Sequence, residues 1–284
     1  STLLDTKNLV QDSHLYRGNI HDNAVSNRLP AVSTQESIEM NRTLAFLTAG
    51  GTGHLPTHKR NGYVRIMFEN WNSLGIFTHS WKLDRINHLI RRHQIDIVAG
   101  CESQCNWTQV PRHRQLSDII SPGYMKKGST AHNLHENFHR DQVGGTAVMG
   151  VGRICNLISD KGYDPTGLGR WSWIKLGKDS VTTYIISAYL PRKPNKHSKG
   201  RTVWDQHTRY FQKQGDLRYP STIFIEDLTS QITQWSKQGN HILLAIDANQ
   251  DVYNGRLAMI LLQEPLNLQC LMEQATGESV PNSH

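Results

Sequence analysis

Three apolar stretches of this sequence each end in side chains that can coordinate a ligand. The first is followed by Asn70 and Asn72, the second by Glu102, and the third by Asp247 and Asn249. A carboxylate and an amide at the same edge of a sheet can share a substrate. The Asp-Ala-Asn sequence at the third end is also typical of an Asx turn that ends a strand.

Residues 64–102 predict a strand, a helix and a second strand, which would position the first two of these strand ends. Val64–Phe68 and Ile95–Ala99 predict buried strands, and the segment between them has helical apolar spacing. The apolar helix face and its N-cap are predicted to be Leu83, Ile86, Leu89, Ile90 and Ser80. Because α/β sheets bind ligands beyond their strand ends, Asn70 and Glu102 are expected to lie at one site.

The third end follows the segment His241–Gln250. Its five consecutive apolar residues, 242–246, predict a fully buried strand. Asp247 and Asn249 come next, and both should point the same way because strand side chains alternate with a period of two.

Composition allows one sizeable mixed domain in the 284 residues. The net charge of +7 favours a polyanionic partner such as nucleic acid or an anionic membrane surface, although solubility explains it equally well. The sequence contains no apolar run of bilayer length and no signal segment, so we expect a soluble, intracellular protein that is not secreted. The four cysteines show no framework spacing and are expected to be reduced: Cys101, Cys105, Cys155 and Cys270.

Residues 1–62 predict a disordered or poorly ordered N-terminal lead, and residues 63–284 the folded domain. The glycine-rich run at 50–53 suggests a phosphate loop, but no Lys-Ser or Lys-Thr follows it and no strand precedes it, which favours a flexible linker. Residues 106–140 are polar and rich in turn formers, which predicts a solvated, mobile excursion. Three histidines within it have the spacing of one helical face and could bind zinc, but without a matched acidic or thiol ligand a chance cluster is favoured: His132, His135 and His139.

The remaining chain predicts further strands and helices. Strands are expected over 143–151, 171–176 and 181–190. The last two are expected to pair antiparallel through a turn at 177–180. Helices are expected over 202–213 and 221–237, and Gly239 should end the second helix as a left-handed cap. Tyr189 stands at the end of the last of these strands. The basic loop that follows, 192–201, is interpreted equally well as a solvated loop or as a phosphate contact.

Taken in order, these motifs resemble those of the endonuclease/exonuclease/phosphatase superfamily, which is DNase I-like. The resemblance covers about 63–284 and rests on Asn70 in Glu-Asn-Trp-Asn-Ser-Leu, Glu102 after Asp-Ile-Val-Ala-Gly-Cys, Gly145 in Gly-Gly-Thr-Ala, Tyr189-Leu-Pro, and Asp247-Ala-Asn. Gly-Arg-Trp-Ser-Trp-Ile-Lys-Leu at 169–176 is most similar to the endonuclease domains of non-LTR retrotransposons.

The resemblance implies a DNase I-like four-layered sandwich, with two packed mixed β-sheets flanked by helices. Asn72 stands where the family has aspartate, and Ile-Asp-Ala-Asn replaces the usual Gly-Asp-x-Asn. The family's Ser-Asp-His segment is not found before the end at Pro281-Asn-Ser-His284, and His284 follows Ser283, so it is given no role. The sandwich is therefore expected to lack its last strand or strands.

The resemblance also implies roles for the site residues. Glu102 would hold Mg²⁺, which Mn²⁺ could replace, and Asn70 would ligate the ion or orient one of its waters. Asp247 would orient or deprotonate the attacking water, Asn249 would hydrogen-bond the phosphate, and Tyr189 would donate to a phosphate oxygen. The further phosphate or nucleic-acid contacts expected are Asn72, Arg192 and Lys193.

Three functions compete at this point. The first is a metal-dependent endonuclease domain of a retroelement-like polyprotein that acts on nucleic acid, chiefly DNA. We expect it to be a monomer inside the cell, with the nucleus as one location. Its activity is expected to be weakened or absent without the family's histidine. The second is a phosphatase of small or lipid phosphates on the same fold. The third is a nucleic-acid-binding remnant without catalysis.

Overall fold

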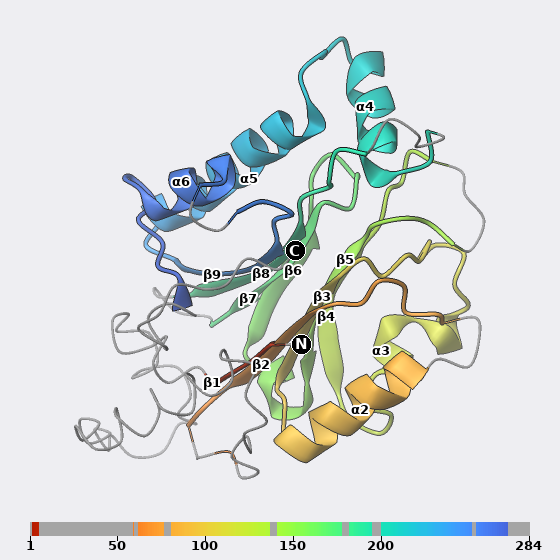
Figure 1. Ribbon diagram of the computed structural model, residues 1–284. Helices are drawn as coiled ribbons and strands as arrows, with labels where there is room; N and C mark the ends of the chain where they lie inside the picture. The colour runs from red at the N-terminus through yellow and green to blue at the C-terminus, as the bar shows by residue number, and fades with distance from the viewer. Residues whose placement is uncertain are drawn as a thin grey trace.

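The computed structural model describes residues 2–5, 59, 62–76, 81–136, 141–177, 182–194, 200–251 and 254–271. These form two β-sheets packed face to face, with helices on both outer faces, as Figure 1 shows. The predicted α/β class and four-layered sandwich are therefore confirmed.

The first sheet has five strands in the order β1-β2-β3-β5-β4. β2 and β3 are parallel, and the other pairs are antiparallel. Its strands are β1 (Thr2–Asp5), β2 (Arg65–Asn70), β3 (Ile97–Cys101), β4 (Lys126–Ala131) and β5 (Thr146–Val151).

The second sheet has four strands in the order β6-β7-β8-β9, in which only β8 and β9 are parallel. Its strands are β6 (Ile158–Tyr163), β7 (Trp171–Leu176), β8 (Thr183–Tyr189) and β9 (His241–Asp247). The predicted antiparallel pairing of β7 with β8 is confirmed, while residues 178–180 of the predicted turn lie outside the described residues.

Helices cover the two outer faces (Figure 1). α2 (Trp81–His93) and α3 (Leu116–Ile119) pack on the first sheet, and α5 (Pro220–Lys237) and α6 (Arg256–Leu262) pack on the second. The shorter elements between them are η3 (Arg112–Arg114), η4 (Gly152–Asn156) and α4 (Val203–Lys213).

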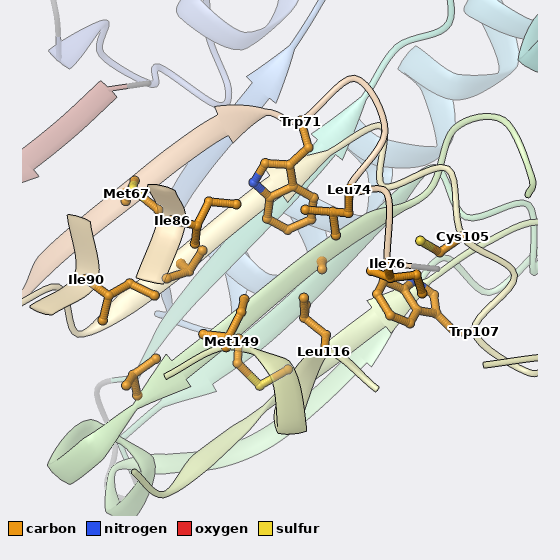
Figure 2. Packing of buried hydrophobic residues seen from close by; sticks show 14 of the residues in the cluster. Met67, Trp71, Leu74, Ile76, Ile86, Ile90, Cys105, Trp107, Leu116 and Met149 are labelled. Atoms are coloured by element: carbon orange, nitrogen blue, oxygen red, sulfur yellow. The ribbon is translucent and has the colours of Figure 1, made fainter. Parts of the chain in front are cut away.

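Three apolar clusters separate the four layers. Strand alternation produces them, because successive residues of one strand point to opposite faces. Met67 packs under α2, whereas its neighbour Ile66 packs between the sheets. Ile185 likewise packs between the sheets and Ile186 faces α5. Figure 2 shows the cluster between the first sheet and its helices.

Several predicted elements agree closely with the structure. Ile86 and Ile90 of α2 are buried, and Leu83 and Leu89 pack against the same cluster. Gly239 has a φ of 79° and follows α5, as a left-handed cap requires. Ser80, the predicted N-cap of α2, lies outside the described residues.

The predicted mobile excursion over 106–140 is wrong for much of that segment. β4 lies within it and pairs with β5 along six residues, and Leu116 and Ile120 are buried in the core. β4 escapes a sequence pattern because its residues, Lys-Lys-Gly-Ser-Thr-Ala, lack apolar alternation. Gly128 lets it pack closely, since a Cβ there would lie 2.2 Å from the Val148 carbonyl oxygen. β6 and α6 are also absent from the predictions.

The histidine spacing does not reflect a helix. His132 directly follows β4, outside any helix, and is buried, whereas His135 lies in a turn and its Nε2 is 2.6 Å from the Thr166 carbonyl oxygen. Burial lowers the pKa of His132 to about 4. His139 lies outside the described residues.

β9 is not fully buried as predicted, because every one of its residues is partly exposed. Among the described strands it has β8 as its neighbour on one side alone, which explains the exposure. All four cysteines are described and free, and three of them are buried. Among the described helices, none has the length and hydropathy needed to cross a bilayer.

Parts of the predicted domain organisation fall outside the described residues. β1 belongs to the predicted N-terminal lead and pairs with β2. Most of that lead, including the glycine-rich run at 50–53, is not described, and neither are residues 272–284 with His284. The lead's disorder, the boundary at 62/63 and the missing last strand remain predictions.

Candidate functional site

The ends of the two sheets meet at one place. Asn70 is the last residue of β2 and Asp247 the last residue of β9, and the Asn70 Nδ2 donates a 2.7 Å hydrogen bond to Asp247 Oδ2. The two residues are 177 positions apart in sequence. The predicted convergence of the strand ends is thus found in the structure.

Glu102 and Tyr189 form the second contact across the sheets. Glu102 follows β3 directly, and Tyr189 is the last residue of β8. Burial raises the pKa of Tyr189, and its hydrogen bond to the Glu102 carboxylate and the charge of Asp247 raise it further. The tyrosine is therefore a neutral hydroxyl that can donate a hydrogen bond.

Asp247 is held by two donors. Its Oδ2 accepts from Asn70, and its Oδ1 accepts from the Asn249 backbone amide at 3.2 Å. The Asn249 side chain donates to the Leu190 carbonyl at 3.0 Å, which ties this turn to the chain just after Tyr189. The carboxylate is fixed in orientation by these contacts, and its residue remains partly exposed.

The turns that follow these strands have strained backbone. Of the eight non-glycine residues with positive φ in the described chain, five belong to them: Asn72, Ser73, Glu102, Gln104 and Asn249, with φ from 41° to 73°. Side chains other than asparagine and aspartate rarely adopt this region, and such strain gathers at functional sites. Glu102, whose carboxylate interacts with Tyr189, is one of these left-handed residues.

The turn after β2 is anchored from three directions. Trp71 N donates to the Cys101 carbonyl at 2.9 Å, and its ring lies so close to Gly100 that a Cβ there would be 2.3 Å away. Lys82 Nζ reaches the carbonyl oxygens of Trp71, Asn72 and Ser73 at 2.7, 2.5 and 3.1 Å. Asn70 Oδ1 accepts from the Asn72 amide at 2.9 Å.

The turn after β3 packs against the glycines that precede β5. A Cβ on Gly145 would lie 2.6 Å from Ser103 Oγ and 2.9 Å from the Ala131 carbonyl oxygen. Gln104 N also donates to the Gly144 carbonyl at 2.9 Å. The close approach predicted for these glycines is confirmed, and it fixes the position of the turn that carries Glu102.

Two polar contacts near the site fix the end of β8. Ser187 of β8 donates to the Gly100 carbonyl of β3 at 2.9 Å. Arg170 precedes β7, and its carbonyl accepts from the Tyr189 amide at 2.9 Å. The first contact joins the two sheets, and the second ties the end of β8 to the residue before β7 within the second sheet.

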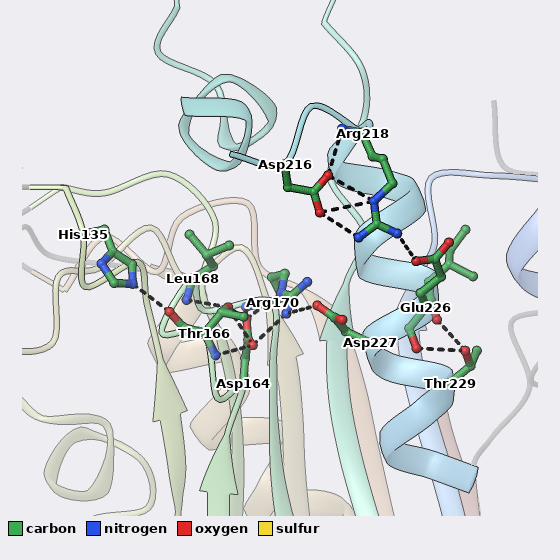
Figure 3. A network of polar contacts seen from close by, with 11 residues as sticks. His135, Asp164, Thr166, Leu168, Arg170, Asp216, Arg218, Glu226, Asp227 and Thr229 are labelled. Atoms are coloured by element: carbon green, nitrogen blue, oxygen red, sulfur yellow. Dashed lines mark hydrogen bonds and ion pairs between the residues drawn. The ribbon is translucent and has the colours of Figure 1, made fainter. Parts of the chain in front are cut away.

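Arg170 is the centre of a buried ionic network, shown in Figure 3. Its Nε and Nη2 donate to Asp164 at 2.6 and 2.9 Å, and Nη2 lies 2.8 Å from Asp227. Burial alone would raise the pKa of Asp164, but the hydrogen bonds and charge of Arg170 outweigh it and hold that pKa below its ordinary value. The guanidinium is 1% exposed, so its role in the Gly-Arg-Trp strand is structural.

The predicted phosphate contacts occupy different positions. Asn72 is exposed and within 3.5 Å of Gln104 Nε2 beside the site. Arg192 and Lys193 are exposed on the segment after Tyr189, and the Lys193 ammonium lies 4.9 Å from the centre of the Tyr219 ring. The structure thus places Asn72 beside the strand ends and Lys193 over the Tyr219 ring.

The donors at the strand ends fit a hard divalent cation. Glu102 and Asp247 supply carboxylates and Asn70 an amide oxygen, which suit Mg²⁺ or Mn²⁺ with several waters. Cys101 is the soft donor at this place, and burial raises its pKa, with Asp247 and Glu102 adding to the effect, so it stays a thiol. Within the described residues no group of three or more His, Cys, Asp and Glu side chains has metal-binding geometry. A cation here would therefore keep few protein ligands.

Sequence reasoning did not find the residues that support this site. Lys82 and Ser187 donate hydrogen bonds to backbone carbonyl oxygens, and the Gln104 side chain donates to the Asn72 side chain. No spacing pattern in a sequence identifies such partners. Arg170 belongs to the Gly-Arg-Trp motif, but only the structure shows its two carboxylate partners.

Comparisons with known proteins give fold likeness alone. No protein-family model matches the sequence, and no curated protein matches it. The human Nocturnin catalytic domain, solved with bound sulfate, is 14% identical, with 77% of this chain and 76% of that chain covered and a TM-score of 0.47.

Two further solved structures have lower TM-scores. The 3′ phosphatase NExo from Neisseria, bound to a product DNA hairpin, is 15% identical, with 64% of this chain and 56% of that chain covered and a TM-score of 0.37. An AP endonuclease from Archaeoglobus fulgidus is 13% identical, with 75% and 68% covered and a TM-score of 0.38. With TM-scores below 0.5, these likenesses do not assign an activity to this chain.

Proposed function

We propose that this chain is a Mg²⁺-dependent hydrolase of phosphodiesters in nucleic acid, with DNA as the main substrate and Mn²⁺ as an alternative ion. The observation that carries the proposal is the Asn70–Asp247 hydrogen bond beside the Glu102–Tyr189 contact, which gathers oxygen donors from both sheets. The charge of +7 supports a polyanionic substrate.

Glu102 and Asn70 would hold the cation, which would supply charge neutralisation at the phosphate. Asp247, fixed by Asn70 and by the Asn249 amide, would accept a proton from the attacking water. Asn249 uses one side-chain hydrogen on the Leu190 carbonyl and keeps the other for a phosphate oxygen. Tyr189, neutral because of its raised pKa, would turn its single hydroxyl proton from Glu102 to another phosphate oxygen when Glu102 holds the cation.

We propose a low turnover for this chain. Among the described residues, no histidine or arginine side chain forms a hydrogen bond with the side chains of Asn70, Tyr189 and Asp247. Losing one preorganised donor at such a site costs about 10²–10³-fold in rate. We also propose that the chain is the endonuclease of a retroelement-like polyprotein, and that it is a monomer inside the cell, with the nucleus as one location. The Gly-Arg-Trp-Ser-Trp strand and the basic composition support this proposal.

The test is nicking of supercoiled plasmid with Mg²⁺, with Mn²⁺ and with EDTA. We expect slow nicking that EDTA stops and that Glu102→Gln abolishes, while Glu226→Gln, a carboxylate on the outer face of α5, keeps the full rate. Inositol phosphates run in parallel distinguish the phosphatase alternative, because phosphate release from them without plasmid nicking would overturn the nuclease. Salt-sensitive DNA binding without any cleavage would leave a binding protein and contradict hydrolysis.

A further inference from the structure

A small surface next to the strand-end site presents two aromatic rings together with a positive charge. Tyr219 is exposed, and the centre of the Trp204 ring lies 6.1 Å from the centre of the Tyr219 ring, with 40° between the two planes. The Lys193 ammonium lies 4.9 Å from the centre of the Tyr219 ring. We refer to these three residues as the aromatic surface.

The aromatic surface lies at the same end of the sandwich as the strand-end site. α5 leads into β9 at the far end of the second sheet, so its N-terminus, which follows Tyr219, lies at the near end. Phe224 of α5 accordingly packs against Trp171, which pairs with β8 close to its end, with the two ring centres 5.8 Å apart. Lys193 follows Tyr189 by four residues, so their Cα atoms are no more than about 14 Å apart.

The second ring of this surface is joined to the site by the packing of α4. Trp204 lies in the first turn of α4, which begins with a capping box. Its neighbour Val203 lies so close to Gly144 that a Cβ on the glycine would be 2.9 Å from Val203 Cγ2. The Gly144 carbonyl in turn accepts from the Gln104 amide, in the turn that carries Glu102. Backbone contacts therefore hold the aromatic surface beside the strand-end site.

Helix capping does not explain the tyrosine of this surface. Tyr219 is the N-cap of α5, a position that favours Ser, Thr, Asp and Asn because their side chains accept from the first helical amides. Within the described chain the Tyr219 side chain forms no capping hydrogen bond. The residue is also 62% exposed, so burial contributes little to keeping it there. An exposed ring beside a cation is instead typical of surfaces on which unpaired bases stack.

We propose that the aromatic surface binds single-stranded DNA, with an unpaired base stacked on Tyr219 and the Lys193 ammonium against a neighbouring phosphate. This rests on the proposed hydrolysis of nucleic acid and narrows its substrate to strands that are unpaired close to the cleaved bond. Any base can stack on the ring, because every base has a π-face, whereas the bases of a duplex already stack on one another. Arg192, exposed beside Lys193, adds charge of the sign that the backbone requires. Negative supercoiling favours strand separation, so a supercoiled plasmid offers such segments.

The test is fluorescence anisotropy, in EDTA, with labelled dodecathymidylate and with a blunt duplex of the same length. We expect the native chain to bind the single strand at least tenfold more tightly than the duplex. Tyr219→Ser should weaken single-strand binding by about 5- to 150-fold, the loss of one stacked base, and duplex binding less than twofold. Tyr219→Phe keeps the ring and should bind within twofold of the native chain.

Three controls separate stacking from a structural role. Tyr219→Ser supplies a preferred N-cap hydroxyl, so its urea unfolding should show a fold at least as stable as the native one. Tyr124→Ala removes a ring that is 57% exposed just before β4, at the opposite end of the sandwich, and should change neither affinity. Lys193→Met should weaken single-strand binding and lower its log–log salt slope by about 0.7, because one phosphate contact is lost.

Equal affinity of the native chain for the two DNAs would overturn the proposal. So would equal weakening of both affinities by Tyr219→Ser, or a Tyr219→Phe variant as weak as Tyr219→Ser. Because binding is measured in EDTA, the outcome is distinct from that for hydrolysis. Tyr219-dependent single-strand binding by a chain that nicks no plasmid would refute the hydrolase alone. Plasmid nicking by a chain whose single-strand affinity does not depend on Tyr219 would refute the aromatic surface alone.

Discussion

At the scale of single residues, the side chains proposed for catalysis also hold one another in place. Asp247 accepts from Asn70 and from the Asn249 amide, and Tyr189 contacts Glu102. Hydrogen bonds from both sheets therefore orient the carboxylate that we assign as the base. Such preorganisation is what a reaction with developing charge requires.

Asp247→Asn should separate the charge of this residue from its shape. Asparagine fills the same space but cannot take up the proton of an attacking water, so we expect plasmid nicking to fall by about 10²–10⁴-fold. DNA affinity should change little. Asp216→Asn, beside Arg218 in the turn between α4 and α5, is the matched control and should nick at the native rate. A native nicking rate in Asp247→Asn would show that Asp247 is not the base.

At the scale of elements, the turns after β2 and β3 depend on close backbone approach. The sequence predicts this close approach at Gly144 and Gly145, because glycines next to a strand indicate that no side chain would fit there. It cannot show what fills the space, which at Gly145 is the Ser103 hydroxyl and the Ala131 carbonyl. Those partners come from a turn with a left-handed backbone and from β4, which lacks apolar alternation.

Gly145→Ala tests that approach against a matched glycine. Gly145 and Gly123 have φ values of 85° and 89°, so alanine costs similar backbone strain at both. A Cβ at Gly123 meets nothing within 4 Å, whereas one at Gly145 meets Ser103 Oγ at 2.6 Å. We expect Gly145→Ala to lower the free energy of unfolding by about 1–3 kcal/mol more than Gly123→Ala, measured in urea. Equal losses would contradict the packing described.

The Arg170 network links the segment before β7 to α5 and positions the Tyr189 amide. Arg170→Met should destabilise the fold by about 3–5 kcal/mol, because Asp164 would be left buried without its cation. Arg218→Met, which removes an exposed arginine paired with Asp216, should change urea unfolding little. If the two variants unfold alike, the buried pair does not stabilise the sandwich as we infer.

At the scale of the whole molecule, buried neutral histidines couple stability to pH. Burial lowers the pKa of His132 to about 4 and that of His207 to about 3, against an ordinary value of 6.5. Between these values the unfolded chain binds more protons than the folded chain. Stability is therefore complete above pH 6.5 and is lost as pH falls, by up to about 1.4 kcal/mol per pH unit for each histidine.

Urea unfolding at pH 7.5, 6.0 and 5.0 measures this loss. His93 and His241 shift in the same direction and add to it, while Asp164, whose pKa is lowered, adds a further loss below about pH 3.8. The double variant His132→Gln, His207→Gln should show a shallower dependence on pH, even if it is less stable at every pH. Stability of the native chain that rises on acidification would contradict these buried neutral states.

Most of the architecture and the strand-end residues could be predicted from sequence, because apolar runs, helical spacing and polar strand ends are local signals. The strand-helix-strand over 64–102 and the hairpin of β7 and β8 are examples. β4 and β6 could not be predicted, since their side chains are largely polar, and the partial exposure of β9 depends on its place in the sheet.

The central claim is that the strand ends carrying Asn70, Glu102 and Asp247 form one oxygen-donor site for a single divalent cation. Titration with Mn²⁺, followed by electron paramagnetic resonance, measures that site without requiring turnover. We expect one Mn²⁺ per chain, competed by Mg²⁺, with affinity at least tenfold weaker in Glu102→Gln and unchanged in Glu226→Gln. Equal Mn²⁺ binding by all three proteins, or none by the native chain, would contradict the claim.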